Sequence, residues 1–93
     1  MLSAFVLINA DPARIDALGH ELAEIGAVRE AHSVAGSDVD LVAVLSIADH
    51  EMLADVVTGE IAKLDGIRET RTLIAFRQYS AADESAAFEG LGD

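Results

Sequence analysis

Three histidines are the side chains of this sequence best suited to metal binding or proton transfer. His20 and His50 are each followed by a glutamate, as at the start of the zinc motif H-E-x-x-H, but position 24 is Glu and position 54 is Ala. A zinc site of that kind needs a second histidine one helical turn later. His20 and Glu24 are therefore interpreted as part of a solvated helix face, and His32 as a surface or interface residue. We predict no metal site and no cofactor.

The carboxylates Asp38 and Asp40 are a second candidate for chemistry, because they lie two residues apart after the turn residues Gly36 and Ser37. Acid–base catalysis would require unlike environments that separate their pKa values, and the sequence does not establish such environments. The chain also lacks a P-loop, a GxGxxG motif, a nucleophile elbow and any cysteine. We predict no catalytic residue. The loop is either a solvated hairpin turn or a binding loop.

The elements that position these residues follow from hydrophobic periodicity. Two segments have apolar residues spaced by three and four, which is typical of helices packed by one face. Four segments are short, apolar and rich in β-branched residues, which is typical of strands. The predicted strands are residues 4–9, 28–35, 39–47 and 67–79, and the predicted helices are residues 12–25 and 49–64.

Local signals mark the ends of the two helices. Asp11 followed by Pro12 is typical of a helix start, and Asp49 is a suitable N-cap for the second helix. Gly26 follows the first helix where a left-handed C-cap residue is expected, and Gly66 follows the second.

The strand patterns predict which residues share a face of the sheet. The alternation of residues 28–34 puts Val28, Glu30 and His32 on one face. In the last strand, Thr70 and Thr72 lie on one face and Leu73 lies on the other. The first and third strands are apolar on both faces, which indicates a sheet that is covered on both sides.

The order β-α-β-β-α-β predicts an α+β fold, a ferredoxin-like βαββαβ sandwich of the dimeric α+β barrel type. In this fold a four-stranded antiparallel sheet carries two helices on one face. The other face has no cover within the chain. Because 52% of the 93 residues are apolar, that face is expected to pack against the open face or the sheet edge of a second copy, giving a homodimer.

Charge and composition restrict the partners. The chain has 17 acidic and 6 basic residues, a net charge of −11, so we expect no direct nucleic-acid binding and no docking on an anionic membrane. The longest apolar run covers only residues 4–8, and no basic segment precedes it, which predicts a cytoplasmic protein. Residues 80–93 are expected to form an acidic tail, in which Phe88 and Leu91 could anchor a short helix.

Two stretches resemble the effector-binding (RAM) domain of the Lrp/AsnC, or feast/famine, transcription regulators. They are VAGSDVDLV (residues 34–42) and LDGIRETRTLI (residues 64–74), with an amphipathic helix between them. The family pattern has a glycine-to-aspartate step and a later Thr-x-Thr step at similar spacing, and the resemblance covers roughly residues 3–79. We therefore predict a ligand-binding domain over residues 1–79.

The resemblance implies dimers that assemble into rings of eight or ten subunits and bind an amino acid or related small effector between dimers. It implies a ligand site made of the hairpin and the Thr-x-Thr strand, facing one cleft. The implied ligand-binding residues are Gly36, Ser37, Asp38, Asp40, Thr70 and Thr72. Family members carry an N-terminal helix-turn-helix that this sequence lacks. We therefore expect a stand-alone domain that acts as a sensor or co-assembles with full-length Lrp/AsnC regulators.

Two alternatives share the same order of elements. Small dimeric α+β barrel enzymes include cofactor-free monooxygenases, which would need a polar cavity, often with histidine or tryptophan. This chain has no tryptophan, and His32 is its only predicted strand histidine. An ACT-type amino-acid-binding domain would differ in pairing its subunits side by side rather than face to face.

Overall fold

The computed structural model describes residues 1–36 and 38–81, and it confirms the predicted order of elements. All bounds agree with the prediction to within a few residues except the end of the last strand. Within this part of the chain, no helix is long and apolar enough to cross a membrane. The elements are β1 (Leu2–Ala10), the short 3-10 turn η1 (Pro12–Arg14), α1 (Ile15–Ala23), β2 (Val28–Ser33), β3 (Leu41–Ile47), α2 (His50–Val56), the π-helical turn η2 (Val57–Ile61) and β4 (Ile67–Ile74).

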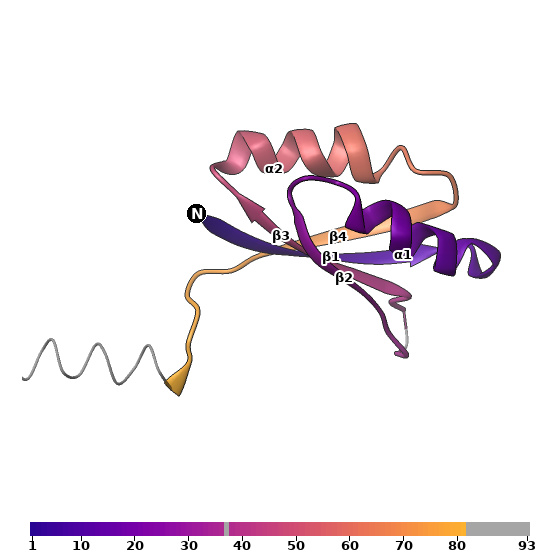
Figure 1. Ribbon diagram of the computed structural model, residues 1–93, viewed down its shortest axis with the longest axis horizontal. Helices are drawn as coiled ribbons and strands as arrows, with labels where there is room; N and C mark the ends of the chain where they lie inside the picture. The colour runs from indigo at the N-terminus through magenta and orange to yellow at the C-terminus, as the bar shows by residue number, and fades with distance from the viewer. Residues whose placement is uncertain (37, 82–93) are drawn as a thin grey trace, which may run out of the picture.

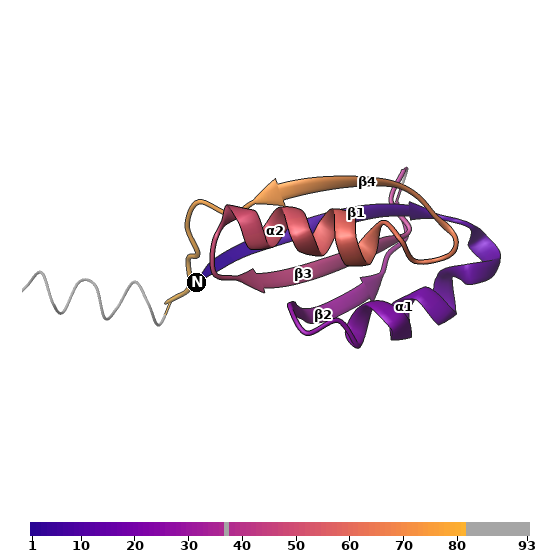
Figure 2. The ribbon, with the colours of Figure 1, turned by 90° about the horizontal axis from the view of Figure 1, so that it is seen from above.

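The four strands form one antiparallel sheet in the order β2-β3-β1-β4. Both helices lie on the same face of this sheet, as Figure 1 shows, and the opposite face carries no element of the described chain. Seen from above, α2 runs over the middle of the sheet and α1 runs beside the β2 edge (Figure 2). The ferredoxin-like α+β fold is therefore confirmed.

The core lies between the helices and the covered face of the sheet. Alternate residues of β1 and β3 point into it, and α1 and α2 contribute residues such as Leu18, Leu22 and Leu53. None of the described side chains in the core is polar or charged. The strand residues of the core are Ala4, Val6, Ile8, Ala10, Val28, Leu41, Ala43, Leu45 and Ile47.

The predicted helix starts are present. The Asp11 side chain accepts a hydrogen bond from the Ala13 backbone at 3.0 Å, and Pro12 begins the 3-10 turn before α1. The Asp49 side chain accepts from the Met52 backbone at 2.8 Å and caps α2. These bonds satisfy backbone donors that have no partner within a helix.

The ends of α1 and β2 differ from the prediction. Among the described residues, only Gly66 has a positive φ, at +99°, so the expected left-handed cap at Gly26 is wrong. The register of β2 shifts between Val28, which pairs with Leu45, and Glu30, which pairs with Val44. This bulge puts Val28 on the covered face, so the predicted common face is wrong for Val28, while Glu30 and His32 share the open face as predicted.

The last strand is shorter than predicted. β4 ends at Ile74 and not at Tyr79, and the last bond that continues its pairing is from the Ala75 backbone N–H to the Ser3 carbonyl, at 2.9 Å. β1, the only neighbour of β4, extends just one residue beyond Ser3, to Leu2, so little strand remains for β4 to pair with. The predicted short helix in the tail lies outside the described residues.

Candidate functional site

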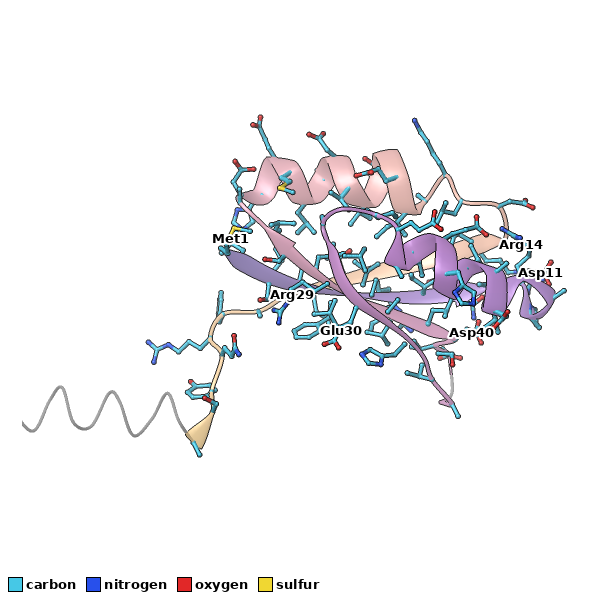
Figure 3. The ribbon with its side chains drawn as sticks, viewed as in Figure 1. Met1, Asp11, Arg14, Arg29, Glu30 and Asp40 are labelled. Carbon is cyan, nitrogen blue, oxygen red and sulfur yellow. The ribbon has the colours of Figure 1, made fainter. Side chains whose placement is uncertain are left out.

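The hairpin loop between β2 and β3 is fixed to the end of β1 by Asp40. Its backbone N–H donates to the Ile8 carbonyl, and its Oδ2 atom accepts from the Ala10 backbone N–H, both at 2.8 Å. The Val34 N–H closes the loop by donating to the Asp40 carbonyl at 3.0 Å. Figure 3 shows Asp40 where the hairpin meets the sheet. One carboxylate oxygen of this predicted ligand residue is therefore engaged within the chain.

The tip of the loop is open to solvent. Gly36 and Asp38 are exposed, and a Cβ atom built on Gly36 would meet no atom within 4 Å. A ligand can therefore approach the Gly36 backbone closely. The Asp38 carbonyl accepts a hydrogen bond of 3.4 Å from the Asn9 side chain, which connects the tip to β1. Ser37, a further predicted ligand residue, lies outside the described residues.

A polar hollow of about 170 Å³ lies beside the hairpin on the open face of the sheet. It holds charges of both signs, because Arg71, Asp38 and Glu69 all line it. A guanidinium can bind a carboxylate, and carboxylates can bind an ammonium group. The arrangement can therefore hold a zwitterion. The lining residues are Leu7, Asn9, Asp38, Glu69 and Arg71.

Arg71 and Glu69 were not predicted as site residues. The register of β4 pairs Arg71 with Leu7 and Glu69 with Asn9, all on the open face. Glu69 immediately precedes the Thr-x-Thr step, and Arg71 is the residue between its two threonines. Strand alternation could have identified them, because it puts them on the face opposite the threonines.

Thr70 and Thr72 lie on the covered face of the sheet, where they pair with Ile8 and Val6. Thr72 lines a mostly apolar hollow of about 340 Å³ between α2 and the β4 edge, together with Ile74. The predicted alternation of β4 is therefore confirmed. Within one chain, however, the Thr72 hydroxyl and the Asp38 carboxylate line different hollows on opposite faces. A single cleft containing both would need two copies of the chain.

A second hollow of about 260 Å³ lies at the other end of the open face, where the chain leaves β4. Phe5 and Val44 form its apolar part, and Arg29 and Glu30 are at its rim. Figure 3 shows Arg29 and Glu30 on the side of the sheet away from the helices. The remaining lining residues are Ser3, Ala75, Arg77 and Gln78.

The open face is balanced in charge, although the chain is strongly acidic. Three bases and three acids line its two hollows, which leaves three bases and fourteen acids for the rest of the sequence. The face also carries exposed apolar side chains, including Leu73 with 54% and Phe5 with 38% of their surface exposed. A face with balanced charge and exposed apolar side chains suits contact with another protein surface.

The histidines are dispersed. His32 lies on the open face with its Nε2 atom 3.3 Å from the Glu30 carboxylate, and His20 lines a separate hollow of about 370 Å³ between α1 and β2. His50 begins α2. Over residues 1–36 and 38–81, no three potential metal ligands come together.

The sheet topology and the hairpin-side hollow define a ferredoxin-like domain with the features of an effector-binding module. The model of the Lrp/AsnC ligand binding domain matches residues 3–84, and the chain belongs to this family. The resemblance found in the sequence is thereby confirmed.

Solved structures and a curated protein support this assignment. The protein TTHA0845 from Thermus thermophilus is 48% identical, with a TM-score of 0.80 over 86% of this chain and 99% of that chain. A feast or famine regulatory protein of M. tuberculosis, solved in complex with L-methionine, is 32% identical, with a TM-score of 0.72 over 87% of this chain and 54% of that chain. An uncharacterized HTH-type transcriptional regulator of Pyrococcus abyssi is 34% identical over 76% of this chain. The match spans only 44% of that regulator.

Proposed function

We propose that this chain is a sensor domain that binds an amino acid or a related small zwitterion and regulates transcription through assembly with regulators of its family. The observation that carries the proposal is the hollow beside the hairpin, which is lined by Arg71 together with Asp38 and Glu69. The open backbone of Gly36 lies two residues before Asp38 in the same hairpin. The M. tuberculosis relative solved with L-methionine supports an amino acid as the ligand class.

The complete site is proposed to form between copies of the chain. A hollow of about 170 Å³ is smaller than the roughly 300–1,000 Å³ of typical ligand pockets, so one chain supplies only part of a site. The positions of Thr70 and Thr72 support the same idea, because their hydroxyls are directed away from the hairpin hollow of their own chain. In the proposed assembly, the hairpin of one copy and the Thr-x-Thr strand of another contact the same ligand.

The basic unit of the assembly is proposed to be a dimer with open sheet faces packed together. Two chains with a net charge of −11 repel each other over most of their surface, and the charge-balanced open face is the surface where this repulsion is smallest. Such dimers then associate into a ring of eight or ten subunits. The acidic surface disfavours DNA contact by this chain, so its effect on transcription is proposed to act through full-length relatives that contact DNA.

Native mass spectrometry of the purified chain, alone and with each of the twenty amino acids, tests this function. We expect an even-numbered assembly that retains one amino acid at about one molecule per chain. Isothermal titration calorimetry with the retained amino acid and with its N-acetyl derivative then tests recognition as a zwitterion, because acetylation removes the ammonium charge. A dimer that retains none of the twenty would contradict the proposed sensor role and favour the barrel-type enzyme or a purely structural partner.

A further inference from the structure

The segment that follows β4 carries two aromatic side chains that its own chain leaves exposed. We call residues 75–81 the arm. Phe76 is fully exposed, and 71% of the Tyr79 surface is exposed. The arm continues from β4 and, in Figure 1, turns away from the side of the sheet that carries the helices. Exposed aromatic rings on an extended segment are costly in water, and they are the side chains that most often anchor protein interfaces.

The open sheet face offers a matching receptor next to the base of this arm. The hollow of about 260 Å³ has Phe5 and Val44 as its apolar part and the charged groups of Arg29 and Glu30 at its rim. A guanidinium stacks favourably on the face of an aromatic ring, and a carboxylate can accept a hydrogen bond from a tyrosine hydroxyl. The hollow therefore suits an aromatic ring, above all that of a tyrosine.

The first part of the arm forms one wall of this hollow in its own chain, because Ala75, Arg77 and Gln78 are among the lining residues. Tyr79 beyond it does not line the hollow and remains exposed. In a twofold dimer packed by the open faces, with its axis near this end of the sheet, the arm of each copy would begin beside the receptor of the other. A twofold axis also makes every contact occur twice, so two arms and two hollows are matched.

We propose that the arm of one copy lies across the open sheet face of a second copy, with the Tyr79 ring in the partner's hollow between Phe5, Arg29 and Glu30. Phe76 covers the apolar surface between the two sheets. This inference rests on the proposed face-to-face dimer and adds to it a reciprocal exchange of arms, which explains why both aromatic residues are exposed in a single chain.

Cysteine cross-linking tests the exchange directly, because the sequence has no cysteine. A Glu30→Cys chain and a Tyr79→Cys chain are mixed, allowed to exchange subunits and treated with a short bis-maleimide. A cross-link between the two variants has to join different chains, and we expect it as a species of twice the 9.8 kDa chain mass. Lys63→Cys, mixed with Tyr79→Cys, is the control, because Lys63 is exposed and lies two residues after Ile61, the η2 residue that packs into the core under the helices.

Tyr79→Ala and Phe76→Ala test the energetic role of the arm. Both side chains are exposed in the single chain, so the fold should be retained, which circular dichroism checks. Sedimentation equilibrium should show a dimer dissociation constant raised about tenfold or more by each change.

The outcomes separate the exchange from the proposed function. A dimer that gives no cross-link in the mixture, or a Glu30→Cys/Tyr79→Cys double variant that links only within one chain, would overturn the arm exchange and leave the dimer and the sensor role standing. A monomer at micromolar concentration would overturn both the exchange and the face-to-face dimer, while amino-acid retention in native mass spectrometry would still report on the sensor role.

Discussion

Asp40 Oδ2 accepts a hydrogen bond of 2.8 Å from the backbone N–H of Ala10, thirty residues earlier in the chain. The bond joins the start of β3 to the end of β1, next to the point where β4 begins pairing with Ala10. The Asp40 carboxylate therefore holds the candidate binding loop in place. Two substitutions separate the contribution of its acceptor oxygen from that of its charge.

Asp40→Ala should destabilise the fold, and Asp40→Asn should do so much less. The alanine variant leaves the part-buried Ala10 N–H without its acceptor, which should lower the free energy of unfolding by about 1–3 kcal/mol. The asparagine carbonyl can still accept this bond, so its cost should stay below about 1 kcal/mol. Urea denaturation followed by circular dichroism gives both values. Equal losses for the two variants would show that the charge of Asp40, and not its acceptor oxygen, stabilises the loop.

Gly66→Ala should destabilise the chain, and Gly26→Ala should not. Gly66 has φ of +99°, and a Cβ atom built on it would lie 2.9 Å from both Cβ and Cγ of Arg14. The strained backbone together with this clash should cost about 1–3 kcal/mol. A Cβ atom on Gly26 would meet nothing within 4 Å, and Gly26 does not have a positive φ. Thermal unfolding of both variants checks the difference, and a similar loss at both positions would contradict it.

The two glycines also illustrate what could be predicted from the sequence. Periodicity in the helices and alternation in β3 and β4 correctly gave the order of elements, the fold class and the faces of most strand residues. Both Gly26 and Gly66 follow an apolar helical stripe, and the sequence offers no means to tell which of the two takes a positive φ. The turn at Gly66 is held by residues far away in the chain, because its carbonyl accepts a hydrogen bond of 2.8 Å from the Asp11 backbone N–H, and spacing does not reveal such a contact.

The candidate site could be predicted only in part, again because it depends on contacts between residues that are far apart in the chain. The glycine-to-aspartate step and the Thr-x-Thr step could be found by spacing, but spacing does not reveal that Asp40 bonds to Ala10. The charged residues that line the hollow with Asp38 depend on the pairing of β1 with β4, which brings Arg71 beside Leu7. The bulge in β2 is likewise a feature of its pairing with β3. The alternation of β2 alone therefore could not show that Val28 and Glu30 lie on opposite faces of the sheet.

Leu73→Glu and Ile74→Glu are a matched pair that tests which face forms the dimer. The two residues are neighbours in β4 with 54% and 46% of their surface exposed, but Leu73 lies on the open face and Ile74 on the covered face beside α2. A buried charge in a face-to-face dimer is costly, so Leu73→Glu should raise the dimer dissociation constant at least about a hundredfold, while Ile74→Glu should leave it almost unchanged. Sedimentation equilibrium measures both constants. If Ile74→Glu raised the dimer dissociation constant more than Leu73→Glu, the dimer contact would instead lie at the groove between α2 and β4.

Thr72→Val should weaken binding of the retained amino acid while leaving the fold intact. Valine matches threonine in shape but has no hydroxyl, and the loss of one neutral hydrogen bond corresponds to roughly a threefold to tenfold weaker affinity. The comparison by calorimetry requires equal assembly masses for variant and wild type, because the proposed site lies between copies. Unchanged affinity with an unchanged assembly would remove Thr72 from the proposed site.

Arg71→Gln should weaken binding more strongly than Thr72→Val. Arg71 is the only cation among the described residues that line the hairpin hollow, and glutamine offers a neutral donor in place of the guanidinium that is proposed to bind the ligand carboxylate. Loss of a charge-assisted hydrogen bond should weaken affinity about tenfold to a hundredfold.

Arg68→Gln is the control for Arg71→Gln, because it makes the same change in charge on the same strand. Arg68 is exposed and does not line either hollow of the open face. If affinity depends on a specific contact at the hollow, calorimetry at low salt will show a loss for Arg71→Gln and almost none for Arg68→Gln. An equal loss for both would instead indicate that arginines attract the ligand only through the overall charge of an acidic protein, and it would contradict a carboxylate contact at Arg71. Repeating both titrations at high salt separates the two cases further, since long-range attraction is screened while a direct contact in the hollow largely persists.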